Sequence, residues 1–141
     1  LLKYARQAEA VGSSRVFVTT NDETQVVGFH ALAAGNVAPG DATTRLMKGM
    51  PANQLVPVIL LTRLALELRH QGKGIGRSLL QDALLKADTA AESIGARAVV
   101  VHAIDHDARL WYGQYGLEPS PTDPHHLILL MKDLRRLVEE A

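Results

Sequence analysis

The two most hydrophobic stretches of the chain have the pattern of strands that are buried on both faces. Residues 58–68 read Val-Ile-Leu-Leu-Thr-Arg-Leu-Ala-Leu-Glu-Leu, and residues 98–103 read Ala-Val-Val-Val-His-Ala. Apolar side chains occupy nearly every position rather than every second one, which is typical of a central strand covered on both sides. We therefore predict two strands in the middle of one sheet.

The segment between these two strands has the spacing of a helix. Positions 79, 80, 83, 84, 87, 90, 91 and 94 are apolar and fall on one helical face. Gly95 follows and can end the helix in a left-handed conformation. The spacing predicts a helix over residues 78–94, and so a βαβ unit at the centre of the fold.

The front of the chain is rich in strand-forming residues. Residues 15–19 and 25–33 carry β-branched and aromatic side chains on either side of an Asn21-Asp22 turn, which predicts a hairpin. Residues 1–11 have the spacing of a helix end. Residues 34–55 lack a clear period, apart from a possible short helix over 44–50, and long connections of this kind are often functional.

The C-terminal part contains two further helices and one strand. Residues 107–115 form a predicted helix that Asp105 or Asp107 caps and Gly116 ends. Residues 127–131 form a predicted strand, and residues 132–141 a polar terminal helix. The elements fit one α/β domain over residues 1–141. Because the chain begins with Leu1 rather than Met, we expect a truncated N-terminus.

Composition excludes several classes of chemistry. The chain has no cysteine, which excludes disulfides, thiolate metal sites and a cysteine nucleophile. Fifteen basic and fifteen acidic residues give no net charge, which argues against broad non-specific nucleic-acid binding but leaves room for a local basic patch. Without an apolar run of membrane-spanning length or a signal peptide, we expect a cytoplasmic protein and no membrane partner.

A glycine-rich turn joins the first central strand to the long helix. It reads Gln71-Gly72-Lys73-Gly74-Ile75-Gly76, with Arg77 directly after it. Alternating glycines let the backbone approach an anion closely, and a helix N-terminus offers unpaired N–H groups with a positive dipole end. The turn therefore predicts a pyrophosphate site, with a ligand-free structural turn as the alternative. The spacing fits neither the P-loop nor the dinucleotide-binding fingerprint.

The turn resembles the Gln/Arg-x-x-Gly-x-Gly/Ala signature of the GNAT family of N-acetyltransferases. The segment from Asp105 to Leu117 resembles the late helix of that family, which ends in an aromatic-Tyr-x-x-x-Gly-Phe pattern; the phenylalanine is Leu117 here. The resemblance implies the GNAT fold: a mixed, mostly antiparallel sheet in which two central parallel strands splay apart, flanked by helices. It also implies acetyl-CoA as the donor.

The resemblance assigns roles to residues along the two signatures. The pantetheine arm would pair with the backbone near Leu64, Ala65 and Leu66. Tyr112 would be the general acid that protonates the departing thiolate, with a buried core tyrosine as the alternative, and Tyr115 would pack against the cofactor arm. The pyrophosphate would be held by Gln71, Gly72, Lys73, Gly74, Ile75, Gly76 and Arg77.

No strong general base stands out, and no metal site is expected. A histidine on an apolar strand, such as His102, is more often a satisfied core residue than a catalyst. Neighbours on a strand point to opposite faces, so the pair His125-His126 is not expected to hold a metal.

A closer resemblance concerns the acceptor. The runs over residues 56–66 and 70–76, and the Pro-Ser-Pro-Thr-Asp-Pro run over 119–124, resemble the toxin branch of the family. This implies acetylation of the α-amino group of aminoacyl-tRNA, a block of translation, a ribbon-helix-helix antitoxin and a homodimer. An α-amine beside an ester is already partly neutral at pH 7, which fits the missing base. The RNA or acceptor contacts would include Arg63, Arg45, Lys48 and Arg15.

Two alternatives stay open at this point. One is the same chemistry on another amine: a polyamine, a small drug-like molecule or a protein N-terminus. The other is an acyl-CoA-binding module without catalysis, against which the presence of Tyr112 argues.

Overall fold

The computed structural model describes residues 15–20, 26–66 and 75–139. Its sheet has six strands in the order β1-β2-β3-β4-β6-β5. All neighbouring strands are antiparallel except the parallel pair β3 and β4. The strands are β1 (Arg15–Thr20), β2 (Val26–Val37), β3 (Val56–Leu66), β4 (Ala98–His102), β5 (Glu118–Pro119) and β6 (His126–Leu130). This arrangement confirms the predicted mixed, mostly antiparallel sheet and the hairpin of β1 and β2.

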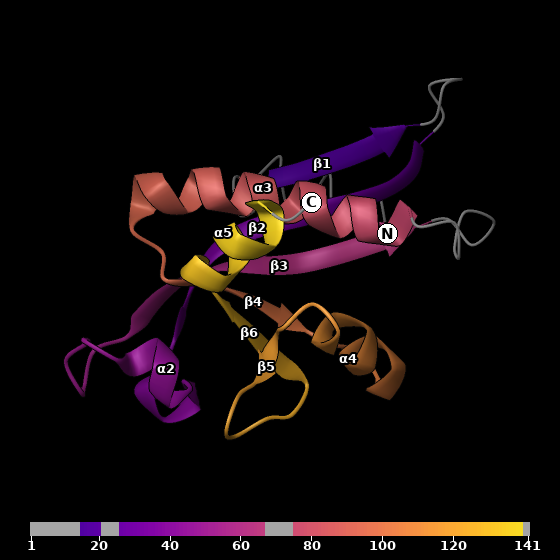
Figure 1. Cartoon of the computed structure of the whole chain (residues 1–141). Helices are drawn as coiled ribbons and strands as arrows, with labels where there is room; N and C mark the ends of the chain where they lie inside the picture. Colours follow the sequence, from indigo (N-terminus) through magenta and orange to yellow (C-terminus); the bar gives the residue numbers. More distant parts are fainter. Residues whose placement is uncertain (1–14, 21–25, 67–74, 140–141) are drawn as a thin grey trace.

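Helices cover both faces of the sheet, as Figure 1 shows. On one face lie α3 (Ile75–Ile94), α4 (His106–Gly113) and α5 (Met131–Glu139), which share one hydrophobic core with β3, β4 and β6. The other face carries the short α2 (Thr44–Met47), whose Leu46 is fully buried in a second, smaller core. A 3₁₀ turn, η1 (Pro39–Asp41), precedes α2. Nothing in the described helices is long and apolar enough to cross a membrane.

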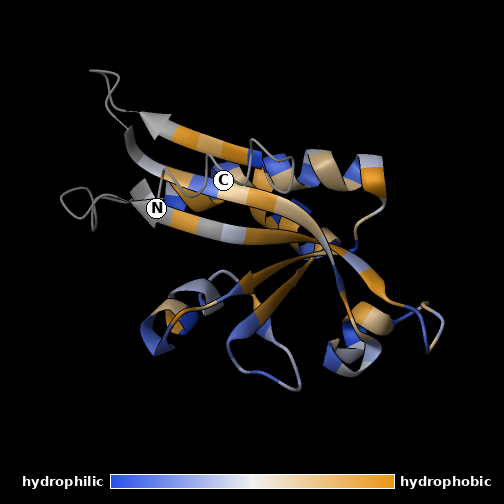
Figure 2. Ribbon diagram, turned by 180° about the vertical axis from the view of Figure 1, so that it is seen from behind, coloured by the Kyte–Doolittle hydropathy of each residue, from blue (hydrophilic) through white to orange (hydrophobic). Residues whose placement is uncertain are grey.

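The two cores explain the continuous hydrophobic runs in the sequence. In β4, Val99 and Val101 face the α3 side, whereas Ala98 and Val100 face the α2 side. Both faces of the strand are buried, so its side chains are apolar at nearly every position instead of alternating between apolar and polar. Figure 2 shows the hydrophobic colour concentrated in the strands, the hydrophilic colour in the loops, and both colours on the helices.

Several element bounds differ from the predicted ones. The helix expected over 78–94 begins at Ile75, because apolar spacing identifies only the buried turns of a helix. Gly95, at φ +74°, ends it as predicted. The strand predicted to stop at 33 continues to Val37. There Gly35 lies against Leu60, where an added Cβ would come within 2.6 Å of a Leu60 methyl carbon, so the glycine permits close packing rather than ending the strand.

Other predictions were incomplete or lie outside the described residues. The short helix expected over 44–50 covers only Thr44–Met47, and β5 was not predicted at all. The predicted helix over residues 1–11 and the Asn21-Asp22 turn fall in the parts of the chain that are not described.

Candidate active site between β3 and β4

β3 and β4 run side by side for only a short distance before they part. Their parallel pairing extends from Ile59–Val99 to Leu61–Val101, whereas β3 continues to Leu66. Figure 1 shows the two strands diverging beyond this point. Within the described chain, the edge of β3 that faces β4 therefore has no strand partner after Leu61.

An extra residue in β3 marks the place where the strands part. In the β2–β3 register, Ala31 pairs with Arg63 and Leu32 pairs with Leu61, so Thr62 has no residue opposite it. The Thr62 hydroxyl donates a hydrogen bond to the Ala31 carbonyl oxygen at 3.2 Å. A bulge of this kind bends a strand and increases its twist, which accounts for the turn of β3 away from β4.

The residues predicted to pair with the cofactor arm lie on this bent end. Leu64, Ala65 and Leu66 pair with residues 28–30 of β2 on one side, and among the described residues no strand pairs with their β4 side. Backbone N–H and C=O groups at an open edge are donors and acceptors that an extended ligand can satisfy. The structure therefore fits an extended, amide-containing ligand along this part of β3.

The first turn of α3 lies at the same end of the sheet as the divergence (Figure 1). It contains Ile75, Gly76 and Arg77, and the Arg77 side chain is exposed. The first N–H groups of a helix have no partner within it and carry the positive end of its dipole, so an anion would be favoured here. Gln71, Gly72, Lys73 and Gly74, the rest of the predicted phosphate turn, lie outside the described residues.

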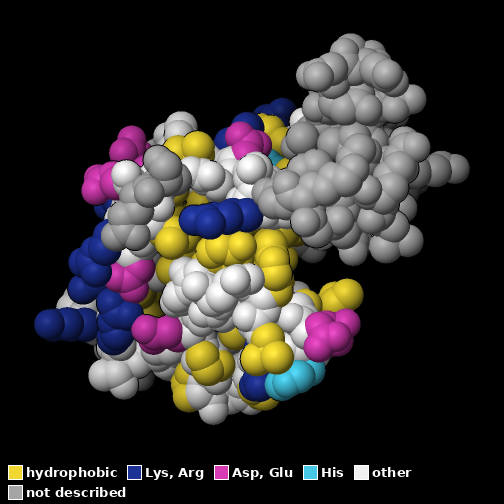
Figure 3. All heavy atoms as spheres, turned by 45° about the vertical axis from the view of Figure 1, so that its right-hand side comes forward, with side chains coloured by type: hydrophobic (Ala, Val, Ile, Leu, Met, Phe, Trp, Pro, Cys, Tyr) yellow, Lys and Arg dark blue, Asp and Glu magenta, His cyan; other side chains and the backbone are white. Residues whose placement is uncertain are grey.

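Arg77 and Tyr115 border a small cavity of about 70 Å³ between α3, the segment after α4, and α5. Its remaining walls come from Leu80, Gln81, Leu84, Leu137 and Val138. Figure 3 shows the side of the molecule on which β3 and β4 diverge: hydrophobic side chains line a hollow there, and a Lys or Arg side chain lies across them. The predicted neighbours of the cofactor are thus brought together from α3 and the segment after α4.

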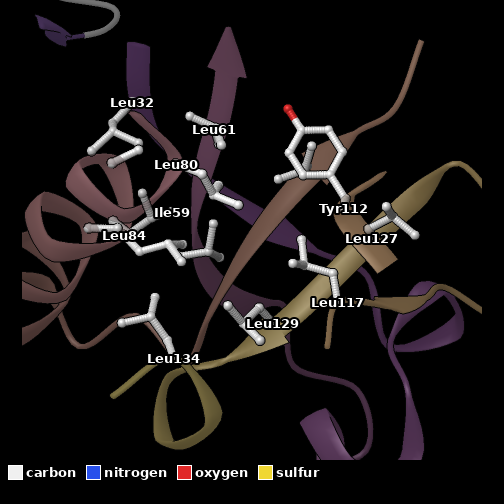
Figure 4. Packing of buried hydrophobic residues seen from close by; sticks show 14 of the residues in the cluster. Leu32, Ile59, Leu61, Leu80, Leu84, Tyr112, Leu117, Leu127, Leu129 and Leu134 are labelled. Atoms are coloured by element: carbon white, nitrogen blue, oxygen red, sulfur yellow. The ribbon is translucent and has the colours of Figure 1, made fainter. Parts of the chain in front are cut away.

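Tyr112 projects from α4 into the core beside the diverging strands. The helix begins after Asp105, whose carboxylate accepts a hydrogen bond from the Ala108 N–H at 2.8 Å. Tyr112 is 9% exposed, and Figure 4 shows its ring beside Leu61 with the hydroxyl directed away from Leu129. Asp105, rather than Asp107, is therefore the residue that fixes the start of the helix carrying this tyrosine.

The surroundings of Tyr112 keep its hydroxyl protonated. Burial raises the pKa of Tyr112 to about 12, because the charged phenolate would lose its hydration. No described residue forms a hydrogen bond with the hydroxyl. Trp111 packs edge-on against Tyr112 and Tyr115, with ring centroids at 5.0 and 5.3 Å. The site therefore presents a fixed neutral phenol that can donate a proton or a hydrogen bond.

A larger cavity of about 460 Å³ opens on the opposite face of the same two strands; we call it the His102 cavity. Leu61, which borders it, also belongs to the core cluster that contains Tyr112. The point where β3 and β4 part is therefore reached from both faces of the sheet. The polar lining of the His102 cavity comprises Asn36, Asp41, Thr62, His102, Ser120 and His126.

His102 does not occupy the buried position that the sequence favoured. It is the last residue of β4, and its side chain is exposed to the cavity. It lies on the same face as Ala98 and Val100, which Ala42 and Leu46 cover. That cover ends before His102, so the hydrophobic run around it misled the prediction.

His102 stands within a cluster of polar groups. His126 lies directly opposite it in the β4–β6 register, with ring centroids 4.5 Å apart. An Asp123 carboxylate oxygen lies 3.9 Å from His126 Nδ1, and the three side chains offer atoms within 4.8 Å of one another. Two imidazoles and a carboxylate at this spacing could also share a cation, so the expected absence of a metal stays a prediction.

Ser120, in the loop over residues 119–124, borders the His102 cavity. The Ser120 hydroxyl donates to the Asp41 carbonyl oxygen at 2.6 Å, and the Thr122 hydroxyl donates to an Asp41 carboxylate oxygen at 2.6 Å. The Asp123 carboxylate accepts the His125 N–H at 2.9 Å, a bond that is the main cause of the lowered pKa of Asp123. The Ser, Thr and Asp of this run are typical of side chains that bond to nearby backbone, and this was the available sequence signal for these contacts.

Four basic residues were predicted to contact RNA or the acceptor, and the three whose side chains are described do not border the His102 cavity. Arg45 forms ion pairs with Glu118 at 2.7 Å and Asp133 at 3.0 Å. Arg45 and Lys48 instead border another cavity of about 450 Å³, together with Arg97 and Lys132. Arg15 is exposed at the start of β1, and the Arg63 side chain lies outside the described part of the structure.

Two known proteins that are similar to this chain are named as toxins. A tRNA-acetylating toxin of Mycobacterium tuberculosis is 51% identical over 138 residues, which cover 98% of this chain and 81% of that protein. A probable toxin, TacT, of Sinorhizobium fredii is 26% identical over 144 residues, covering 96% and 80%. No protein-family model matches the chain.

Solved structures share the fold. AtaT complexed with acetyl-methionyl-tRNAfMet superposes with a TM-score of 0.85 at 20% identity, covering 96% of this chain and 82% of that one. An AtaT tyrosine-to-phenylalanine mutant, bound to the C-terminus of the antitoxin AtaR and acetyl-CoA, gives 0.79 at 21% identity, covering 97% and 80%. These likenesses confirm the predicted fold.

Proposed function

The chain belongs to the family of tRNA-acetylating toxins with the GNAT fold, and from this premise we propose that it transfers an acetyl group from acetyl-CoA to the α-amino group of an aminoacyl-tRNA. The observation that carries the proposal is the gap between β3 and β4. Tyr112 borders the gap from the α3 face and the His102 cavity opens on the other. A donor and an amine that approach from opposite faces would meet there.

The residues around the gap fit acetyl-CoA, which supplies the thioester that is consumed. The open edge of β3 at Leu64, Ala65 and Leu66 can pair with the amide groups of the pantetheine arm, as backbone groups do in a sheet. The α3 N-terminus with Arg77 favours the pyrophosphate, and Tyr115 would pack against the arm. The phosphate site would also include Gln71, Gly72, Lys73, Gly74, Ile75 and Gly76.

Tyr112 would act as the general acid. Its side chain is 9% exposed, its hydroxyl has no partner among the described residues, and its pKa of about 12 keeps it protonated at neutral pH. A thiolate that leaves within a dry site is strongly basic, because it lacks hydration. A positioned phenol can therefore stabilise the departing sulfur by donating its proton.

The acceptor would be the free α-amine of an amino acid esterified to tRNA. Such an amine is partly neutral near pH 7, because its ordinary pKa near 8 falls further beside an ester. The His102 cavity, at about 460 Å³, is within the size range of small-molecule sites and borders the gap. Acetylation would remove the nucleophilic amine that peptide-bond formation requires, which makes the protein a translation inhibitor.

The partners follow the same family pattern. We propose a ribbon-helix-helix antitoxin that neutralises the toxin, a homodimer as the working form, and the cytoplasm as its place of action. Arg15, Arg45, Lys48 and Arg63 stay candidates for the RNA contacts. Lys48 is supported by its place beside Arg97 and Lys132. The guanidinium of Arg45 is already paired with Glu118 and Asp133, so a phosphate would have to compete with these carboxylates.

A direct test is incubation of the protein with a charged tRNA pool and labelled acetyl-CoA, followed by identification of the labelled amino acid. We expect label on the α-nitrogen of one or a few amino acids released from tRNA. Deacylated tRNA is the matched control and should take up none. If only polyamines or protein N-termini were labelled, the proposed acceptor would be wrong. If acetyl-CoA bound without release of thiol, the protein would be a non-catalytic binding module.

A further inference from the structure

His102 is a titratable side chain that the proposed donor site does not use. It ends β4, its side chain is exposed, and it borders the His102 cavity together with Thr62 of β3. Those two residues come directly after the last paired residues of their strands, Val101 and Leu61. His102 therefore stands at the mouth of the gap, on the face opposite Tyr112.

Polar side chains from several neighbouring elements surround His102. His126 packs edge-on against it from β6, and Asp123 of the adjoining loop lies within 4.8 Å of the pair. Asp41 borders the same cavity from the segment after β2, and Thr62, facing it from β3, is uncharged. The His102 side chain is exposed, so a proton on its ring can exchange with water.

We propose that His102 accepts the proton that the acceptor amine loses during acetyl transfer, an inference that rests on the proposed function for its amine substrate but not for its RNA. The amine nitrogen forms a bond to the acetyl carbon while the carbon–sulfur bond breaks. The proton displaced from nitrogen goes to His102, and the sulfur takes a proton from Tyr112. Exchange with water returns both side chains to their starting forms, so the net products are an amide and a thiol.

The proposal places one acid and one base on opposite faces of the sheet, one for each proton transfer. Tyr112 serves the leaving group from the core, and His102 serves the nucleophile from the cavity. Histidine is the side chain best suited to take up a proton near neutral pH. Among the described residues, two strand histidines border this cavity, His102 and His126. The assignment gives a role to the first of them.

The test compares His102→Ala with His125→Ala, a neighbouring histidine outside the cavity lining. Acetyl transfer is measured on amino-acid methyl esters, which carry the same amine without RNA, and on charged tRNA, between pH 6 and pH 9 in EDTA. We expect His102→Ala to lower kcat/KM about 100-fold or more at pH 7, with a smaller loss at pH 9, where hydroxide can take the proton. Added imidazole should restore part of the rate, and His125→Ala should retain it.

Two readouts separate this role from a structural one. Both variants should bind acetyl-CoA and unfold thermally as the parent does, and in cofactor-free protein an amino-acid ester should shift the His102 ring resonances but not those of His125. An unrescued, pH-independent loss, or full activity of His102→Ala on the esters, would overturn the proposal. Loss of the parent rate in EDTA would overturn it in favour of a bound cation. Activity on esters but not on tRNA would count against the RNA acceptor alone.

Discussion

Burial gives Tyr112 two properties that a proton donor needs. The hydrophobic cluster around it fixes its ring beside Leu61, and the same dry surroundings raise its pKa to about 12. The phenol is a weaker acid than tyrosine in water, but it is fully protonated wherever the protein works. The hydroxyl is therefore the one atom of this side chain whose removal should affect chemistry without affecting packing.

Replacing Tyr112 by phenylalanine should reduce acetyl transfer while leaving the donor site intact. We expect kcat to fall about 10²- to 10⁴-fold, with an acetyl-CoA Kd within about twofold of the parent value. Rate measurements with saturating acceptor, together with calorimetric titration of acetyl-CoA, would check both. Trp111→Phe is a packing control and should keep most of the rate. Full activity of Tyr112→Phe would remove Tyr112 as the acid.

The raised pKa of Tyr112 also predicts a loss of stability at alkaline pH. The unfolded side chain loses its proton near pH 10, whereas the folded one holds it until about pH 12. The native state is therefore fully stable below pH 10 and loses stability as pH rises toward 12, by on the order of 2 kcal/mol. Urea unfolding at pH 9 and pH 11 should show a larger drop for the parent than for Tyr112→Phe. Equal drops would contradict the assignment.

At the scale of elements, one side-chain hydrogen bond lies at the start of α4 and another at the β3 bulge. Asp105 satisfies the Ala108 N–H at the start of a helix of only eight residues, and short helices rely heavily on such caps and on packing. Thr62 satisfies the Ala31 carbonyl oxygen at the bulge. Each small contact positions one side of the gap.

Removing the α4 cap should weaken both stability and catalysis. Asp105→Ala should lower the free energy of unfolding by about 1 kcal/mol and reduce kcat several-fold, because the helix that carries Tyr112 frays at its start. Asp107→Ala, in the same first turn but without the cap bond, should cost less on both counts. Chemical unfolding and initial rates of the two variants would decide, and an equal effect of both would argue against the cap.

At the scale of the whole molecule, a polar contact ties the sheet to α3. The fully buried His30 of β2 shares a hydrogen bond of 2.9 Å with Asp82 of α3, and Lys86 donates to the same carboxylate at 2.8 Å. Phe17 of β1 stacks on His30 at 5.0 Å, with the Lys86 ammonium 4.9 Å from the centre of the Phe17 ring. The strands β1 and β2 are thus joined to the helix that begins the donor site.

This contact predicts a loss of stability in mild acid. Burial lowers the pKa of His30 below its ordinary value of 6.5, and the bond to Asp82 opposes but does not cancel the shift. The unfolded histidine therefore takes up a proton first, so stability is present above pH 6.5 and is lost as pH falls through the lower folded value.

Thermal unfolding between pH 7.5 and pH 5 measures the effect. The Tm of the parent should fall over this range, and His30→Gln should lack that part of the fall, although it starts from a lower Tm. His125→Ala, a histidine outside this contact, should keep the parent slope. The same slope in His30→Gln as in the parent would exclude His30 as its source.

Much of the fold followed from local patterns. The apolar spacing over 78–94, the continuous runs in β3 and β4, and Gly95 all indicate structure that depends on neighbouring residues, and the described elements agree. The prediction that the strand ends before Gly35 was wrong. This glycine allows close packing against Leu60, a residue of another strand, which local patterns do not reveal. β5 was missed because two residues have no period to recognise, and only pairing with β6 defines them.

The sequence by itself determined most of the elements and the family, because periodicity and the motifs around Gly72 and Tyr112 are local properties of the chain. The described members of the predicted donor site lie on β3, at the start of α3, and on or just after α4, and their roles stay a prediction. Only the tertiary structure decided which faces the side chains share. It exposed His102 at a cavity and tied Arg45 into ion pairs, because burial and charge pairing depend on elements that are distant in sequence.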